Sequence, residues 1–571
     1  EVFDYYRAAL TRLEEIALRD RDPLAEDAFK HIGDHLKDML SFNSLFDELR
    51  EMIERLHTHY PRWYQPIKAV DTLLYFSVSW KVPEDYHRQL REYYDELLPK
   101  QSVDLLLLYS SGGSIDFHDP DVPYNRDEVS DHDFNSRQID QIIRESPPSS
   151  AYFFPLLDEF LSGRYNLAPS VLQNISRHIS DTEVLLGELI AKISSETEIP
   201  VAETLVRGVI VGAHQKDQSL GLNSLHTALS VDKLKPYGIH LISAVELNDD
   251  LMRQAIELIK TDVVDPFQAV HIAWDDYLEK ITPALTKEFL QTIQEKGANG
   301  AWATIRFLSS WLYSFDIKQV WQVEPIIQSV TNPALFECEQ YSHTDWYSWR
   351  HLIENLINGG YLTEDICCRL LRFIISSVDL QNFDIQLSFE DNGQQVLHHL
   401  ISSYPNLVWE KYIDKKEALE EANTLRLQCL FDADFRNASA GGVLSNLPVE
   451  IYVPWMLDDK QNRLKFILSW IGLFDGREDS RSWAPKFIDF INTYIDAVDQ
   501  LDPIHSRLTT GGWIGSYSSM LEEQREHLKQ LEDVSGNVYV KQWVYKTLTQ
   551  MDRSIADQRR RDANFDATNR A

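Results

Sequence analysis

Carboxylate and histidine side chains are concentrated between residues 116 and 133, where they could bind a divalent metal ion. Carboxylate oxygens suit hard cations such as Mg²⁺ and Ca²⁺, and imidazole adds a nitrogen ligand. The spacing differs from that of an EF-hand loop, which needs oxygen ligands at alternate positions, a central Gly and a closing Glu. One hypothesis is therefore a metal-assisted hydrolase with its site in 116–133, and the simpler interpretation is a solvated acidic loop. The candidate ligands are Asp116, His118, Asp119, Asp121 and His132.

Other chemical motifs are weak or missing. His31 and His35 stand four residues apart on a predicted helix, but two ligands do not complete a metal site, so we interpret them as surface histidines. The chain contains no phosphate-binding loop of the Gly-x-x-x-x-Gly-Lys-Ser/Thr type, no Gly-x-Gly-x-x-Gly and no His-Glu-x-x-His. The sequence therefore predicts no catalytic residue and no cofactor.

Tryptophans cluster in the middle of the chain and have two interpretations. Aromatic side chains dominate both hydrophobic cores and the centres of binding surfaces. Trp302 and Trp311 share a helical stripe with apolar neighbours, which favours core packing, while Trp321 and Trp346 are the candidates for partner binding. The cluster consists of Trp302, Trp311, Trp321, Trp346 and Trp349.

The sequence predicts that helical hairpins position these residues. Runs of about a dozen residues with helical apolar spacing recur along the chain, separated by short turns, in units of about 35–45 residues. This pattern predicts an all-α, HEAT-like α-solenoid of stacked helical hairpins with a C-terminal capping helical unit. The predicted parts are an N-terminal helical segment (1–110), an acidic Gly/Pro-containing loop (111–150), a helical-repeat solenoid (151–440) and a C-terminal helical cap (441–571).

Local signals mark several helix starts. Ser180 and Glu183 have the spacing of a capping box, and Thr282, followed by Pro283 in the first turn, and Thr363 are expected to cap two further helices. The segment 383–389 alternates apolar and polar residues as a strand does, but a single such run cannot build a sheet. We therefore expect a loop there that can adopt an extended form.

Composition restricts the classes of partner. The formal net charge of −34 disfavours nucleic acid, whose binding depends on Lys and Arg neutralising phosphates. The sequence shows no apolar run long enough to span a bilayer, so no membrane contact is expected. Four cysteines in 571 residues match neither a disulfide framework nor a zinc motif, and a cytoplasmic location is the simplest expectation.

The segment Gly511-Gly512-Trp513-Ile514-Gly515-Ser516 is followed by Leu521, Arg525 and Leu528 on one predicted helix and by Val538 and Trp543 on the next. This pattern over 445–571 resembles the C-terminal helical-repeat region of large bacterial multidomain proteins with nucleotide-dependent switch or effector domains, many of the antiviral-defence type. The resemblance implies a scaffold role for these residues and no catalytic one. The structural residues that it implies are Gly512, Trp513, Ser516 and Trp543.

The first residues already have helical apolar spacing and no initiator Met precedes them, from which we expect a further domain upstream. The combined interpretation is a non-catalytic sensor or scaffold that binds a protein partner and regulates that upstream domain. The metal-assisted hydrolase at 116–133 and a purely structural oligomerisation adaptor remain alternatives, and a homo-oligomer is compatible with either scaffold role.

Overall fold

The chain forms two compact units in a computed structural model. The first contains Glu1–Ile272 and Asp276–Ile281, and the second contains Ala273–Asp275 and Thr282–Ala571. The structure describes residues 2–19, 23–77, 80–111, 117–120, 134–195, 201–273, 276–313, 317, 320–337, 343–380, 383–418, 426–428, 430–431, 442–475, 482–509 and 517–569.

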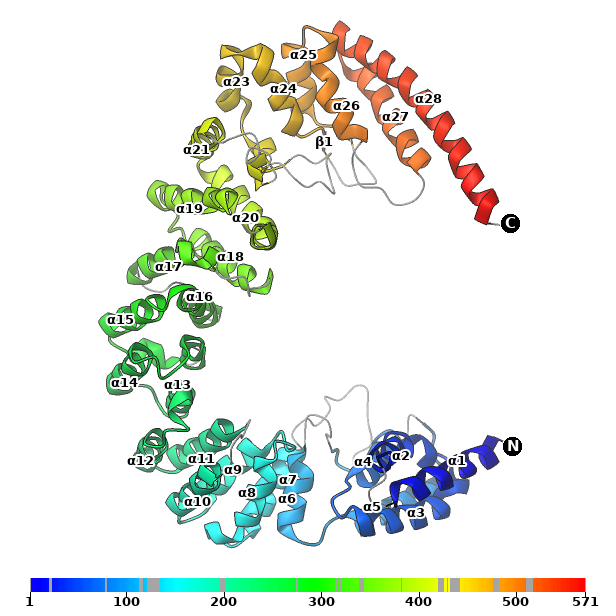
Figure 1. The fold of residues 1–571 in the computed structure, drawn as a ribbon, viewed down its shortest axis with the longest axis vertical. Coiled ribbons are helices and arrows are strands. Elements are labelled where there is room, and N and C mark those ends of the chain that lie inside the picture. The colour runs from blue at the N-terminus through cyan, green and yellow to red at the C-terminus, as the bar shows by residue number, and fades with distance from the viewer. Residues whose placement is uncertain are drawn as a thin grey trace. The chain divides into compact units, whose positions relative to one another are not determined.

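The first unit consists of helices (Figure 1). They are α1 (Val2–Ala17), α2 (Ala25–Leu40), η1 (Asn43–Leu45), α3 (Phe46–His59), α4 (Gln65–Tyr75), α5 (Glu84–Leu97), α6 (Ser102–Ser110), α7 (Phe134–Glu145), η2 (Ser150–Tyr152), α8 (Phe154–Leu161), α9 (Ala168–His178), α10 (Thr182–Ser195), α11 (Ala202–Lys216), α12 (Gln218–Leu229), η3 (Lys235–Tyr237), α13 (Gly238–Ile242), α14 (Asp249–Lys260), η4 (Pro266–Ile272) and η5 (Asp276–Lys280).

The second unit adds one very short β-hairpin to its helices. Its elements are α15 (Pro283–Gln294), α16 (Gly297–Tyr313), η6 (Val320–Gln322), α17 (Val323–Val330), η7 (Pro333–Glu337), α18 (His343–Asn358), α19 (Glu364–Ser376), η8 (Ser377–Asp379), α20 (Phe383–Ser403), α21 (Pro405–Ala418), η9 (Val443–Asn446), α23 (Val449–Asp458), α24 (Lys460–Trp470), β1 (Phe474–Asp475), β2 (Ser482–Trp483), α25 (Pro485–Tyr494), η11 (Val498–Leu501), α26 (Asp502–Thr509), α27 (Tyr517–Val534) and α28 (Val538–Asn569). The two strands pair antiparallel, with Phe474 opposite Trp483.

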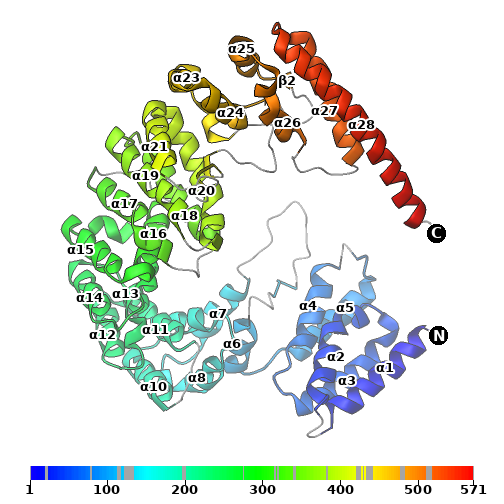
Figure 2. The same ribbon diagram turned by 45° about the horizontal axis from the view of Figure 1, so that its top comes forward.

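Within each unit the helices stack in two rows, as an all-α solenoid requires. In the first unit α7, α9, α11 and α13 contact one another in order, and α8, α10 and α12 form the second row. In the second unit the rows are α16, α18 and α20 on one side and α15, α17, α19 and α21 on the other, and α27 and α28 lie side by side at the end (Figures 1 and 2). The predicted fold class is confirmed.

Hydrogen bonds between successive hairpins reveal the repeat length. The last carbonyl groups of a helix have no partner within it, so a donor from elsewhere must satisfy them. Repeatedly that donor is a side chain about one hairpin later, at sequence separations between 36 and 43 residues, in agreement with the predicted period. The donor and acceptor residues are Tyr60 and Ala17, Lys216 and Ile179, Lys486 and Leu447, Arg507 and Ile471, and Asn537 and Ile495.

Two glycines allow unusually close packing of α11 on α9. A Cβ atom would lie 2.3 Å from the Pro169 carbonyl oxygen at Gly208, and 2.1 Å from the Gln173 carbonyl oxygen at Gly212. These glycines are four residues apart, so both face α9. The Ser176 hydroxyl donates to the Val209 carbonyl across the same contact, over 2.9 Å. The helix backbones therefore pack directly against each other here.

Local signals predicted some helix starts and missed others. Helices α15 and α19 begin directly after Thr282 and Thr363, which confirms both helix starts. The Thr363 side chain caps α19 by accepting from the Ile366 N–H, whereas the Thr282 side chain makes no cap hydrogen bond, so the predicted cap there is wrong. The capping box at Ser180 is wrong, because α10 begins at Thr182 and the Ser180 hydroxyl instead donates to the Pro148 carbonyl.

Two further expectations are corrected. Segment 383–389 belongs to α20, since Ile385 and Phe389 stand four residues apart and both are buried on one helical face. Segment 111–150 is not one irregular loop, because α7 occupies Phe134–Glu145, with Phe134, Ile139 and Ile143 buried. None of the helices in the described ranges has the length and apolar character that a membrane span requires.

Candidate functional site

The predicted metal-ligating residues fall largely outside the described residues, which include His118 and Asp119 but not Asp116, Asp121 or His132. His118 is engaged by protein groups. Its backbone N–H donates to Asp71 Oδ1 over 3.0 Å, its Nδ1 lies 2.9 Å from Asp71 Oδ2, and its ring stacks on Tyr75 at a centroid distance of 3.7 Å. Among the described residues, no three His, Cys, Asp or Glu side chains gather as metal ligands would. The metal site stays a prediction.

Asp71 is a polar residue that the sequence analysis did not single out. It lies on the apolar run of α4 and is fully buried. Lys68 Nζ lies 3.5 Å from its carboxylate and 5.4 Å from the centroid of the Phe117 ring, and the Phe117 N–H donates to Asn135 on α7. Asp71 therefore anchors His118 to α4, while Asn135 binds Phe117 from α7. In the sequence, the available signal was an isolated carboxylate in an apolar helix.

The other residues that the sequence singled out are exposed, are packed in the core or lie outside the described residues. His31 and His35 are exposed. Trp346 is 1% exposed and packs on Trp302 and Phe389, so it belongs to the core and offers no surface to a partner.

Trp321 is half-buried, with its ring centroid 6.1 Å from that of Trp311 and 5.6 Å from Lys287 Nζ. Trp543 is buried on α28, whereas Gly512, Trp513 and Ser516 lie outside the described residues.

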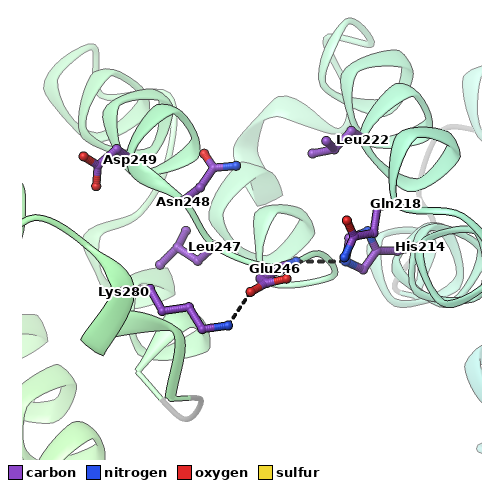
Figure 3. Close-up of a pocket in the computed structure, with 8 residues that line it drawn as sticks. All are labelled: His214, Gln218, Leu222, Glu246, Leu247, Asn248, Asp249 and Lys280. Atoms are coloured by element: carbon purple, nitrogen blue, oxygen red, sulfur yellow. Dashed lines mark hydrogen bonds and ion pairs between the residues drawn. The ribbon is translucent and has the colours of Figure 1, made fainter.

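A groove of about 350 Å³ lies at the junction of successive hairpins in the first unit (Figure 3). Its walls come from the end of α11, the start of α12, the segment that leads into α14, and the end of η5. The residues that line it are His214, Gln218, Leu222, Glu246, Leu247, Asn248, Asp249 and Lys280. Sequence analysis missed this site, because its side chains come from positions more than thirty residues apart.

Helix caps and one glycine shape this groove. The Asp217 side chain caps α12 by accepting from the Leu220 N–H, and α12 then folds back onto α11. The two helices touch closely at Gly221, where a Cβ atom would lie 2.5 Å from His214 Cβ. On the other wall Asn248 caps α14, its Oδ1 accepting from the N–H groups of Asp250 and Leu251 over 3.0 Å each. Helix-cap hydrogen bonds and the close contact at Gly221 therefore fix the walls of the groove.

Two polar contacts fix Glu246 between the walls, and Figure 3 shows both. The Glu246 N–H donates to His214 Nε2 over 3.2 Å, so a neutral His214 carries its proton on Nδ1. The Lys280 ammonium donates to the Glu246 carboxylate. That hydrogen bond and the Lys280 charge lower the pKa of the Glu246 carboxyl below its ordinary value. Glu246 is thus ionised at neutral pH and already paired.

The remaining groups of the groove suit a peptide better than an anion. The N–H groups at the start of α14 are partly taken by Asn248, and Asp249 and Asp250 place negative charge in that first turn, which disfavours an anion. Gln218 and Asn248 are exposed amides: Gln218 has donors and an acceptor, whereas Asn248, whose Oδ1 caps α14, adds its N–H donors. Leu247 supplies a buried apolar floor. The lining residues contain no Ser, Thr or Cys nucleophile, and their chemistry fits recognition.

Comparison with known proteins adds little to these findings. No family model matches the chain, and no curated protein matches it. One solved structure, described as a circular tandem repeat protein with novel repeat topology and enhanced subunit contact surfaces, aligns over 98% of this chain and 99% of its own at 13% identity. Its TM-score is 0.17, which is too low to establish a shared fold.

Proposed function

We propose that the chain is a non-catalytic helical-repeat scaffold that binds a protein partner, with the groove of Figure 3 as one contact surface. The observation that carries this proposal is the exposed amide pair, Gln218 and Asn248, beside a fixed backbone and an apolar floor. Amide side chains can donate to and accept from the peptide groups of an extended segment. The excess of carboxylates over cations in the whole chain favours a partner segment with basic residues.

A regulatory role is the second part of the proposal. The resemblance over 445–571 supports a scaffold that belongs to a larger bacterial protein of the antiviral-defence type, with a switch or effector domain upstream. Binding of a partner would then shift the population of that domain, provided that the partner contacts its two states with different affinity.

Site-specific photo-crosslinking in the whole protein, expressed in its own host, tests the groove. A photoreactive residue at Gln218 should capture one partner protein, whereas the same residue at Asn223, exposed on α12 but outside the groove, should not. With the captured partner in hand, Asn248→Ser keeps a side-chain oxygen for the helix cap and removes the amide donors without adding charge. We expect it to weaken binding by about twofold to tenfold, the value of one hydrogen bond, and Asn223→Ala should leave binding unchanged.

The alternatives give different results. Equal capture from both positions would contradict a groove-specific partner. Crosslinks formed only with other copies of the same chain would favour the oligomerisation adaptor instead.

A further inference from the structure

A second pocket, of about 450 Å³, lies in the first unit, remote in sequence from the groove of Figure 3. Its walls come from the end of α2, from α4, from the start of α5 and from the turn between α4 and α5. The residues that line it are Lys37, Asp38, Ser41, Leu73, Trp80, Lys81, Val82, Pro83 and Tyr86. The floor is rigid, because Leu73 and Tyr86 are buried and the Tyr86 hydroxyl donates to the Leu40 carbonyl.

Trp80 is held at this pocket although nearly half of it is exposed. It is 46% exposed, and its ring stacks on Phe76 with centroids 5.1 Å apart. Hydrogen bonds from the Trp80 N–H to the Phe76 carbonyl and from the Val82 N–H to the Ser77 carbonyl hold the turn. A large aromatic side chain left accessible beside a preformed cavity is a frequent centre of a binding surface.

Lys81 adds an unusual backbone conformation at the same place. Its φ is +54°, in the left-handed region that favours Gly, and among the described non-glycine residues only Asp262 shares a positive φ. Such strain persists where the surroundings impose it and often accompanies a functional turn. The conformation presents the exposed Lys81 beside Trp80.

The charges of the pocket oppose those of the molecule as a whole. Lys37 Nζ lies 5.8 Å from the centroid of the Trp80 ring and 3.5 Å from Asp38, and Lys81 adds a second ammonium group. The pocket therefore carries two cations and one carboxylate in a chain whose net charge is −34. A ligand with negative charge finds two ammonium groups here, in a chain whose overall excess of carboxylates disfavours such a ligand.

From this arrangement we propose that the Trp80 pocket binds an acidic peptide segment of a partner protein, with one aromatic or large aliphatic side chain of that segment inserted between Leu73, Trp80 and Val82. Acidic residues on either side of the inserted residue pair with Lys37 and Lys81. A nucleic acid fits less well, because it carries a charge at every phosphate and the pocket offers only two ammonium groups within an acidic chain. This site is separate from the groove of Figure 3, and either can fail without the other.

Selection of displayed random twelve-residue peptides on the full chain tests the proposal, with the Trp80→Ala chain as the counter-target. We expect the peptides that depend on Trp80 to carry Asp or Glu around a single aromatic or large aliphatic residue. A fluorescein-labelled copy of the most enriched peptide should lose at least about tenfold in affinity on Trp80→Ala, as truncation of a central aromatic does. Lys81→Gly should cost roughly twofold to fivefold, the value of an exposed ion pair, with weaker binding at higher salt.

A matched variant tests whether relief of backbone strain elsewhere in the first unit affects peptide affinity. Lys81→Gly relieves the positive φ and removes the ammonium group, whereas Asp262→Gly relieves the same strain at the turn after α14. Asp262→Gly should leave peptide affinity unchanged. The proposal is overturned by an absence of Trp80-dependent enrichment, by enrichment of basic peptides, or by affinity that survives Lys81→Gly intact. Binding of a single-stranded oligonucleotide that depends on Trp80 would replace it with a nucleic-acid site.

Discussion

At the residue scale, polar side chains join segments that lie far apart in the sequence. Asp71 is fully buried on α4 and holds His118, while His214 accepts from the Glu246 backbone at the groove. Another such pair is His240 on α13 and His271 on η4, whose rings stack with centroids 4.2 Å apart. These side chains connect segments that are far apart in the sequence.

The histidine pair predicts acid sensitivity in the first unit. Burial, with smaller effects from His271 and Arg207, lowers the pKa of His240 to about 4, and burial also lowers that of His271. Between the ordinary value of about 6.5 and pH 4, the unfolded state binds more protons, so the free energy of unfolding decreases as the pH falls. Hydrogen-exchange protection of 238–242 should therefore drop across this window.

His240→Phe keeps a ring for stacking but has nothing to protonate, so it should reduce the pH dependence of that protection. His31→Gln, at an exposed position on α2, is the control and should leave the dependence as in the native chain. An undiminished pH dependence in His240→Phe would contradict the assignment.

At the scale of elements, neighbouring helices are joined by close backbone contact and by side chains that cap the preceding hairpin. Asn537 makes hydrogen bonds to two such helices. Its Nδ2 donates to the Ile495 carbonyl at the end of α25, and its Oδ1 accepts from the Tyr539 N–H at the start of α28. One residue thus ends one helix and starts another, which fixes the position of α28 within the second unit.

The contact between α9 and α11 predicts a large effect of one methyl group. Gly212→Ala would place Cβ 2.1 Å from the Gln173 carbonyl oxygen, so the helices must move apart. We expect a loss of about 1–3 kcal/mol in the free energy of unfolding, typical of overpacking, measured by denaturant unfolding followed by circular dichroism.

Gly187→Ala on α10 provides the comparison, because nothing lies within 4 Å of the position that its new methyl group would take. That change should stabilise the helix by up to about 1 kcal/mol, because Ala has the higher helix propensity. Equal effects of the two substitutions would contradict the close backbone contact between α9 and α11.

At the scale of the whole molecule, the division into two units follows contacts and not simply chain order. Residues 276–281 belong to the first unit, where Lys280 pairs with Glu246, although residues 273–275 before them belong to the second. The first unit therefore ends at Ile281. The predicted parts 1–110, 151–440 and 441–571 stay predictions, and the boundary at Ile281 between the two units differs from all of theirs.

A fragment that ends at residue 281 should fold with the same hydrogen-exchange protection in α11–α14 as the whole chain. A fragment that ends at residue 272 lacks Lys280 and the packing of Leu278 and Ile281, which are both buried. We expect lower protection of 246–260 in the shorter fragment. Identical protection in the two fragments would contradict the assignment of 276–281 to the first unit.

The scaffold role predicts that the purified chain turns over neither ATP nor DNA. Phosphate release and nuclease assays with added Mg²⁺ or Mn²⁺ measure this directly. Robust turnover that is lost on replacing Asp119, Asp121 and Asp131 with Ala would favour the metal-assisted hydrolase at 116–133.

Local sequence signals were sufficient to predict the helical class, the repeat length and several individual elements. Thr363 caps α19, Gly360 follows α18 with a positive φ, and the stripe of Trp302 and Trp311 is buried, because each depends on neighbours within a few residues.

The meeting of particular polar residues, in contrast, depends on how the hairpins stack. Glu246 contacts His214, 32 residues earlier in the chain, and Lys280, 34 residues later. A periodic pattern predicts separations of about this size, but it does not predict which residues of the two hairpins meet. Phe389 likewise enters an aromatic cluster with Trp346 and Trp349, and such packing outweighs the strand-like alternation of 383–389. Both proposed binding sites arise in this way, since residues from helices far apart in the sequence become neighbours only when the helices pack.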